Sequence, residues 1–476
     1  MPASNLPRRI FAQASPTSVG GTSMFSGSKP ITTKSVAEFR SDPKVITRAK
    51  DRLRRAGFDV LASNRLTINI AGSATTYQRA FGRRLKAVEH EILKERRERG
   101  PSTFIEVEET PLPGLIDTSE SDLADVVEGV AIEEPAVYYA APRPFPPKVD
   151  YWHLEVPGDV SLALNADVVH RDGITGSGVN VVMSDTGWYR HRFFQRRGYR
   201  VTDALLGPGA ARPDRDEVGH GTGESANAFA AAPDIEFRLV KNGHVNLTGG
   251  FNAAVGLAPD IISCSWGYDI RNGPLSAANR ALAASVAQAV ADGIVVVFSA
   301  GNGHYGFPGQ HPDVISAGGT YMDKDGKLRA SNYSSGFESR IYSGRKVPDV
   351  CGLVGQVPAA AYIMLPLEPG DEIDATSYGG NHPQRDETKR DDGWAAFSGT
   401  SAAAPQIAGV CALIKHACPA LDPAEIRDIL KRTARDVTEG SNAHRERARE
   451  GRDLATGAGL VDAEAAVRSA KRRCGP

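Results

Sequence analysis

Ser401 has the clearest chemical setting in the sequence, because it lies among small residues in the run FSGTSAAAP, residues 397–405. An apolar stretch at 409–414 follows it and predicts a helix that begins near the serine. A helix N-terminus presents unpaired backbone N–H groups and the positive end of the helix dipole, which favour a negative charge nearby. A serine in this position is also an ordinary helix cap, so its role depends on the rest of the chain.

Three further polar residues stand where predicted strands end or a helix begins. Asp185 follows the β-favouring run 179–183, and Asn302 follows the apolar run 294–298. His220 lies between two glycines at the start of an alanine-rich helix. In open α/β sheets, sites form at the carboxyl ends of the strands. An acid, a base, an amide donor and a hydroxyl are therefore expected to meet at one edge of a sheet.

The order Asp, His, Ser along the chain is that of the subtilisin-type triad, and six short motifs resemble those of the subtilisin-like serine proteases (subtilases). They are the aspartate motif at 184–187, the histidine motif at 219–222, the substrate-backbone strand at 263–267, the oxyanion segment at 299–302, the pocket-floor loop at 306–312 and the serine motif at 399–405. Each motif alone is weakly specific. Six of them in the family's order indicate a serine endopeptidase.

The resemblance implies a role for each side chain. Ser401 is expected to attack the scissile carbonyl, with His220 as the base that removes its proton. Asp185 would hold the imidazole tautomer, and Asn302 would donate its side-chain amide to the oxyanion. The substrate-binding residues that the resemblance assigns are Ser263, Ser265, Trp266, Gly267, Ala300, Gly301 and Gly306. The segments 299–301 and 306–308 carry no charge, which predicts a pocket for an apolar side chain before the cut bond.

The region after residue 150 alternates β-favouring runs with alanine-rich helical runs. This alternation predicts an α/β fold with a doubly wound, mostly parallel sheet over residues 151–476, as the resemblance to subtilisin-like proteases also implies. A second, smaller domain is expected at the N-terminus, because 476 residues are typical of two domains.

The N-terminal region divides by composition. Residues 1–30 are rich in Ser, Pro and Gly and are expected to be disordered. Residues 31–112 show the order α-β-β-α-β-β of a small α+β unit and resemble the activation prodomain of sedolisin-type proteases. Residues 113–150 are acidic and then proline-rich, which predicts an extended linker that holds a processing site. A self-processing zymogen with its own prodomain as inhibitor is one expectation, and an accessory interaction domain is the other.

The composition of the chain limits which partners, cofactors and cellular location are expected. The net charge of −1 favours neither nucleic acid nor an anionic membrane as a partner, and no apolar run is long enough for a transmembrane helix. No secretory signal is visible and the five cysteines are scattered, so free thiols and a cytoplasmic location are expected. Acidic residues lack the regular spacing of a calcium loop, so no metal or other cofactor is expected.

Two features depart from the family pattern. Glu224 lies four residues after His220 on the same predicted helix face, where sedolisins carry a second acidic residue. It is expected to be solvated or to support the site, with Asp185 as the partner of the histidine. The charged segment 365–394 precedes the serine motif and is either a mobile surface insertion or a lid or exosite. Two other functions stay open, a processing protease dedicated to one partner and a catalytically silent binding protein of the same fold.

Overall fold

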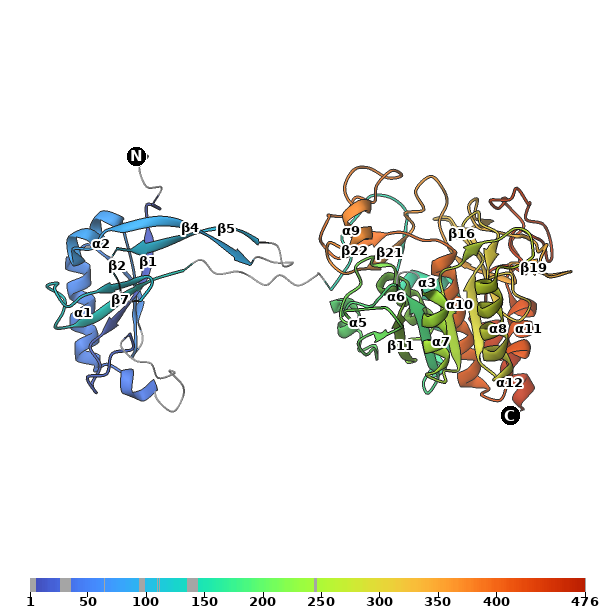
Figure 1. Ribbon diagram of the computed structural model, residues 1–476, viewed down its shortest axis with the longest axis horizontal. Coiled ribbons are helices and arrows are strands. Elements are labelled where there is room, and N and C mark those ends of the chain that lie inside the picture. Colours follow the sequence, from blue (N-terminus) through green and yellow to red (C-terminus); the bar gives the residue numbers. More distant parts are fainter. Residues whose placement is uncertain are drawn as a thin grey trace. The chain divides into compact units, whose positions relative to one another are not determined.

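The computed structural model describes residues 6–25, 36–63, 65–93, 99–108, 110, 112–134, 144–243 and 246–475. The chain divides into two compact units, residues 1–140 and 141–476 (Figure 1). Among the helices that the structure describes, none is long and apolar enough to cross a membrane.

The N-terminal unit is built on a five-stranded antiparallel sheet in the order β2-β3-β1-β7-β6, accompanied by two helices and a hairpin. Its elements are β1 (Ile10–Pro16), the 3₁₀ turn η1 (Val36–Phe39), α1 (Pro43–Arg55), β2 (Asp59–Ser63), β3 (Ile68–Gly72), α2 (Ala74–Phe81), β4 (Leu85–Leu93), β5 (Arg99–Val107), β6 (Leu115–Asp117) and β7 (Val127–Ile132). The predicted order α-β-β-α-β-β is present in α1 to β5. Both helices have an N-cap residue: the side chains of Asp42 and Ser73 accept hydrogen bonds from backbone N–H groups in the first turns of α1 and α2.

Two expected boundaries of this unit are wrong. Residues 10–16 were expected to be disordered but form β1, which lies between β3 and β7 and buries Ile10, Ala12 and Ala14. Residues 115–132 were assigned to the linker but form β6 and β7 of the same sheet. The physical reason is that alternating apolar residues in both segments complete the buried face of the sheet.

The second unit has a mostly parallel sheet in the order β10-β11-β9-β12-β14-β16-β17, with β20 also paired to β16. Only the β16–β17 pairing in this sheet is antiparallel. Its strands are β9 (Asn180–Asp185), β10 (Leu205–Leu206), β11 (Glu236–Lys241), β12 (Ile261–Cys264), β14 (Val295–Ser299), β16 (Ile315–Met322), β17 (Leu328–Ala330) and β20 (Val350–Leu353). The strands predicted between 179 and 317 are therefore confirmed.

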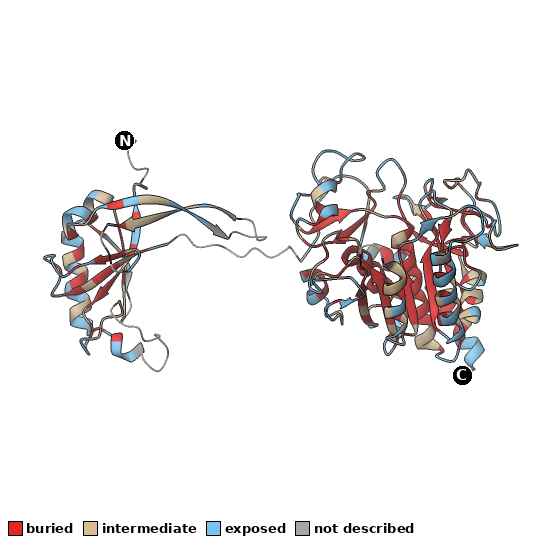
Figure 2. Cartoon of the chain, viewed as in Figure 1, coloured by how far each residue is buried: buried red, intermediate tan, exposed pale blue. Residues whose placement is uncertain are grey.

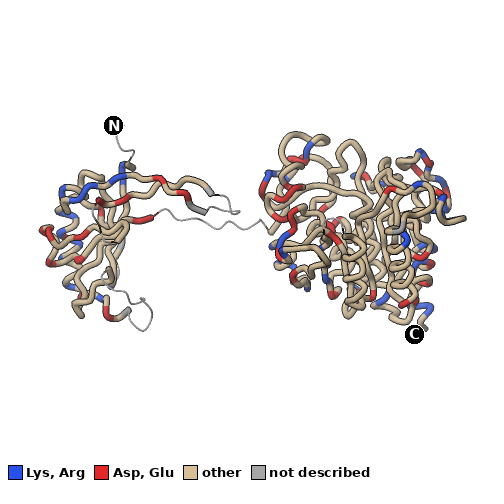
Figure 3. The backbone as a smooth tube through the Cα atoms, viewed as in Figure 1, with Lys and Arg blue, Asp and Glu red and all other residues tan. Residues whose placement is uncertain are grey.

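Both faces of this sheet are covered, as the buried central strands and their flanking helices show (Figure 2). Alternate residues of one strand enter different cores: Val181 joins the core of α6 and α10, whereas Val182 joins that of α7 and α8. The helices of the second unit are α3 (Gly158–Ala163), α4 (Ala166–Arg171), α5 (Arg192–Arg196), α6 (His220–Ala231), α7 (Leu247–Val255), α8 (Ala277–Ala291), α9 (Glu372–Ser377), α10 (Thr400–Ala417), α11 (Pro423–Thr433) and α12 (Ala463–Cys474). The central strands β12 and β14 carry no charged residue, and much of the Lys, Arg, Asp and Glu lies in the outer parts of the unit (Figure 3).

The segment 365–394 is not a free surface loop. It connects β21 (Ile363–Pro366) with β22 (Trp394–Ala396), which pair with each other and, through β21, with β8 (Leu154–Glu155). Leu365 and Leu367 are fully buried, which anchors the start of the segment in the core. The remaining short strands are β13 (Tyr268–Asp269), β15 (Gly306–Phe307), β18 (Phe337–Glu338) and β19 (Lys346–Val347).

The expectation of free thiols is wrong for two of the five cysteines. A disulfide joins Cys418, the C-cap of α10, to Cys474, the last residue of α12. The two helices pack side by side, and their ends bring these residues to a Cα–Cα distance of 5.9 Å. Cys264, Cys351 and Cys411 are buried free thiols.

Candidate active site

Asp185 and His220 are brought together at the carboxyl edge of the sheet. Asp185 ends β9 and is only 2% exposed, and His220 begins α6. The Nδ1 of His220 lies 2.7 Å from Oδ1 of Asp185, so the ring nitrogen donates to the carboxylate and the other nitrogen, Nε2, is left to accept a proton. Burial opposes the charged imidazolium, but the attraction of Asp185 outweighs it and raises the pKa of His220 above its ordinary value.

A buried carboxylate, Asp216, ties the aspartate and histidine segments together. Its Oδ1 accepts from the hydroxyl of Thr186 at 2.8 Å and from the N–H of Gly219 at 3.1 Å. Its Oδ2 accepts from the N–H and hydroxyl of Thr222 at 2.8 and 2.7 Å. Thr186 adjoins Asp185 and the other two flank His220, so one side chain fixes the geometry of the pair.

Ser401 lies in the first turn of α10, as the sequence predicted, with Gly399 as the N-cap. Its Oγ donates to the carbonyl oxygen of Ser265 at 3.2 Å, and the hydroxyl of Ser265 donates back to the Ser401 carbonyl at 2.8 Å. The serine is half-buried, so a substrate can reach it. This reciprocal pair fixes the first turn of α10 against the segment that follows β12.

Asn302 is oriented by the residue next to the serine. Its Oδ1 accepts from the N–H of Thr400 at 2.9 Å and from the Thr400 hydroxyl at 3.0 Å. Both acceptor positions are thereby used, and the amide nitrogen Nδ2 remains as a donor beside Gly399. A Cβ at Gly399 would lie 2.7 Å from Nδ2, so only glycine leaves room for this amide.

A cavity of about 170 Å³ lies beside Ser401 and Asn302. It opens where β12 and β14 part, since Cys264 and Phe298 are the last paired residues of these strands. Five of the predicted substrate-binding residues line it, namely Ser265, Trp266, Gly267, Gly301 and Gly306. Ser263 and Ala300 are buried within the fold and do not line it, because their backbones continue the sheet.

The cavity beside Ser401 contains a charged residue that the prediction of an apolar preference did not include. Asp269, at the end of the paired strands β13 and β15, lines the same cavity. Its Oδ1 accepts from the N–H of Tyr305 at 2.7 Å, which directs the carboxylate toward the loop before Gly306. The sequence-based prediction considered only the segments around Ala300 and Gly306 and missed the strand across from them.

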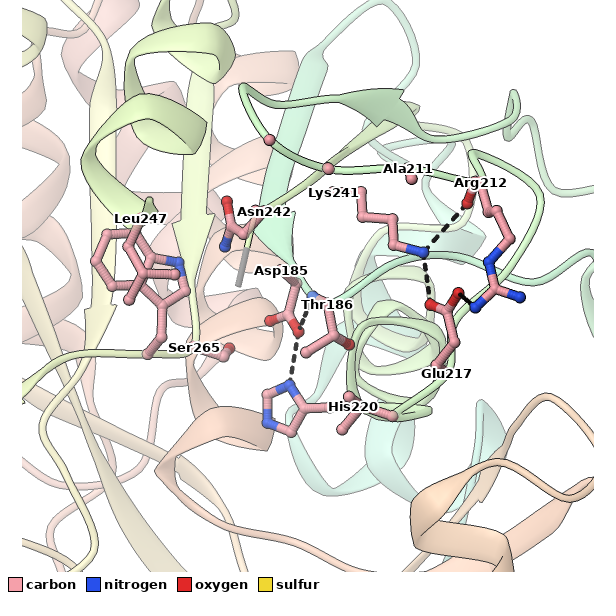
Figure 4. Close-up of a pocket in the computed structure, with 15 residues that line it drawn as sticks. Asp185, Thr186, Ala211, Arg212, Glu217, His220, Lys241, Asn242, Leu247 and Ser265 are labelled. Atoms are coloured by element: carbon pink, nitrogen blue, oxygen red, sulfur yellow. Dashed lines mark hydrogen bonds and ion pairs between the residues drawn. The ribbon is translucent and has the colours of Figure 1, made fainter. Parts of the chain in front are cut away.

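A second cavity, of about 540 Å³, is lined by Asp185 and His220 (Figure 4). Leu247 and Trp266 give it apolar walls, and Asn242 adds an amide. Lys241 lies at the edge of this cavity. Its ammonium donates three hydrogen bonds, to the carbonyls of residues 212 and 215 and to the carboxylate of Glu217, which uses all three of its N–H groups. Ser265 and Trp266 line both cavities, so one chain segment runs past the whole site.

Glu224 is not solvated. It is completely buried on α6, where its Oε2 accepts from the side-chain amide of Asn227 at 2.9 Å. Asn227 in turn accepts from Gln406 of α10 at 3.0 Å, so a chain of polar groups connects the two helices. Burial raises the pKa of Glu224 to about 8, which keeps the carboxyl neutral at pH 7. Asp185, and not Glu224, is the acidic side chain in hydrogen-bond contact with His220 among the described residues.

Comparisons with known proteins show which sequences and structures this chain resembles. A family model described as "Subtilase family" matches residues 176–459. Alkaline elastase YaB of Bacillus sp. (strain YaB) is 28% identical over 320 residues, which cover 64% of this chain and 68% of that protein. Subtilisin Savinase of Lederbergia lenta is 26% identical over 333 residues, which cover 66% of this chain and 99% of that protein. The solved structure of sphericase matches with a TM-score of 0.44 and 22% identity, over 60% of this chain and 92% of that one.

Proposed function

The chain belongs to the subtilase family and is a serine-type endopeptidase, and on that premise we propose that Asp185, His220 and Ser401 carry out its hydrolysis of peptide bonds. The observation that carries the proposal is the 2.7 Å contact of His220 with Asp185, at the sheet edge where the first turn of α10 presents Ser401. A positioned acid–base pair at a serine is what activates a hydroxyl for attack.

The reaction divides into acylation and deacylation. When a peptide binds, the hydroxyl of Ser401 turns from the Ser265 carbonyl and gives its proton to Nε2 of His220 as Oγ attacks the scissile carbonyl. Asp185 stabilises the imidazolium, which then protonates the leaving amine. Water repeats the sequence on the acyl-enzyme and releases the second product.

The charge that forms on the carbonyl oxygen needs donors that are already in place. Nδ2 of Asn302 is one, because Thr400 occupies the other end of the amide. The backbone N–H of Ser401, in the first turn of α10, is the second. Such preorganised donors stabilise the transition state more than the ground state.

The two cavities suit an extended peptide that crosses the triad. Ser265 and Trp266 line both, and an extended substrate can pair with this segment by strand addition. A broad endopeptidase should therefore cleave many unrelated peptides in a library. Cleavage of one partner protein alone would favour the dedicated processing enzyme, and no cleavage of any substrate would favour the silent binding protein.

Asp269 is expected to favour a basic side chain before the cut bond. The carboxylate lies in the cavity next to Ser401, where it can pair with an arginine or lysine of the substrate. Replacement of Asp269 by Asn should lower kcat/KM for such substrates roughly tenfold to a hundredfold and leave apolar ones within about twofold. A library profile of both variants checks this, and equal losses for both substrate classes would contradict it.

We also propose that the N-terminal unit is a prodomain that the enzyme itself removes. Its sheet ends at Ile132, and the second unit begins at residue 141, so the cut is expected between Glu133 and Lys148 and not in the earlier part of the predicted linker. Tethering gives this segment an effective concentration of about 1 mM, so a weak sequence preference is enough.

Self-processing has a direct test. Purified wild type should resolve on a gel into two fragments, and the inactive Ser401→Ala variant should stay full length. N-terminal sequencing of the larger fragment should begin between residues 134 and 148. A wild-type chain that stays full length and still cleaves peptides would favour an accessory domain.

A further inference from the structure

The segment 367–393 is hydrogen-bonded to the loop that carries His220. The N–H groups of Glu372 and Ile373, in the first turn of α9, donate to the carbonyls of Glu217 and Val218 at 3.0 and 3.2 Å. The carboxylate of Glu368 accepts from the N–H of Asp216 at 2.7 Å. These contacts involve three consecutive residues of the loop, which ends just before His220.

The same segment leads into the serine. Asp374 accepts at Oδ2 from the N–H groups of Gly370 and Gly393, which closes the segment on itself at 2.7 and 3.3 Å. Gly393 is followed by β22, which runs directly to Ser401. The segment is therefore hydrogen-bonded to the loop before His220 and is continuous in the chain, through β22, with the start of α10 that carries Ser401.

Asp371 lies at the centre of this contact. Its Oδ1 accepts from the N–H of Asp374 at 2.8 Å and so caps α9. Its Oδ2 is buried, has no hydrogen-bond partner among the described residues and faces Gly219, where a Cβ would lie 2.0 Å from it. Gly219 has a φ of 90°, so both backbone and space require glycine at the residue before His220.

The charges around Asp371 are mostly negative. Asp216 faces it from the histidine loop, and Glu368 and Asp374 face it from its own segment. Glu368 is paired with Arg215, and Glu217, on the same loop, is paired with Lys241 and Arg212. His220 follows Gly219 in the chain, and its imidazole is hydrogen-bonded to Asp185. Asp371 itself has no cation within ion-pair distance in the described part of the chain.

We propose that residues 367–393 form a clasp that holds the His220 loop in its catalytic position, and that the clasp stays closed only while Asp371 keeps its proton. A neutral carboxyl can lie unpaired against Gly219 among three other acids, whereas a carboxylate there is repelled by them. Asp371 is in this sense a positioning residue for the triad. The proposal rests on the proposed function for its effect on catalysis, but the closing of the clasp does not depend on activity.

The direction of the pH effect follows from burial, which with the neighbouring acids raises the pKa of Asp371 to about 9 in the closed clasp. In the open clasp the carboxyl has an ordinary value near 4. Between about pH 4 and pH 9, closing of the clasp is therefore accompanied by the uptake of a proton by Asp371. The closed state is fully favoured below about pH 4, and it loses stability as the pH rises from about 4 to about 9, by roughly tenfold in the closing equilibrium per pH unit.

The test compares wild type with Asp371→Asn, in which the amide still caps α9 and cannot ionise. Hydrogen exchange of the peptide that contains Glu372 and Ile373 is measured from pH 5 to 10 and corrected for the intrinsic exchange rate. In wild type, the protection of this peptide against hydrogen exchange should fall by up to tenfold per pH unit until about pH 9. In Asp371→Asn, the protection of the same peptide should stay constant. In parallel, kcat of the variant should equal wild type at pH 6 and exceed it by tenfold or more at pH 9.5.

Glu372→Gln is the matched control, because that side chain is exposed on the same turn of α9 and should leave both profiles unchanged. Should Asp371→Asn fail to fold, Asp371→Ser, which also caps a helix, takes its place. The proposal is overturned if hydrogen-exchange protection depends on pH in the same way in wild type and in Asp371→Asn. It is also overturned if the ratio of the two kcat values stays the same from pH 6 to pH 9.5. A protein that shows the protection difference but cleaves nothing would instead refute the proposed function and leave the clasp intact.

Discussion

Replacement of Ser401 by Ala should abolish peptide hydrolysis, with a loss of about a million-fold in kcat, the size typical of losses within a serine triad. The hydroxyl of Ser401 lines the smaller cavity and contacts Ser265, which lines both cavities, whereas the neighbouring Thr400 hydroxyl is bound to Asn302. Without it, only binding and the oxyanion donors remain, and these give an acceleration of about a thousand- to ten-thousand-fold over the reaction in water.

The fold should survive this change. Ser401 Oγ is half-exposed and makes one described hydrogen bond, whereas the helix start is fixed by Thr400 and Asn302. Circular dichroism and the thermal midpoint of the variant should match wild type within a few degrees. Residual activity within tenfold of wild type, in a folded preparation free of other proteases, would contradict the assignment of the nucleophile.

Replacement of Asp185 by Asn should lower kcat by about ten-thousand-fold. An amide at this position can present its N–H₂ group to Nδ1 of His220, which would favour the tautomer that cannot accept the serine proton. The variant also loses the charge that raises the pKa of His220, so the acid limb of the rate profile should move to lower pH.

Glu224→Gln is the matched change, since it also converts a buried carboxyl near His220 into an amide. A neutral Glu224 differs little from Gln, so kcat should remain within about tenfold of wild type. Side-by-side kinetics of the two variants decide which acid serves the histidine. A larger loss in Glu224→Gln than in Asp185→Asn would show that the histidine depends on the acid of α6.

The residues of the candidate site could be picked out from the sequence because they stand at the ends of regular elements. Asp185 ends one largely apolar strand and Asn302 follows another, whereas His220 opens a helix between two glycines and Ser401 lies in the first turn of a helix after Gly399. Local patterns of this kind reveal both the element and its carboxyl or amino end. In a parallel sheet, those ends share one edge, so the four side chains were expected together.

The parts that were mispredicted depend on partners distant in the chain. β1 reads as a Ser- and Pro-rich terminus until β3 and β7 are placed on either side of it. The Cys418–Cys474 bond depends on two helix ends that sequence spacing does not relate. Asp269 enters the cavity only because β13 pairs with β15. The burial of Glu224 and the docking of α9 follow from packing between elements, which no local pattern encodes.

Active-site labelling with a fluorophosphonate tests the central claim most directly, because the probe reacts only with a serine that an adjacent base has activated. The adduct should appear on one residue, Ser401, when the labelled protein is digested and mapped by mass spectrometry. Labelling should be absent in Ser401→Ala and at least a thousandfold slower in His220→Ala. An adduct on a different serine, or no adduct on a folded wild-type protein at any pH from 6 to 10, would contradict the assignment of Asp185, His220 and Ser401 as the catalytic triad.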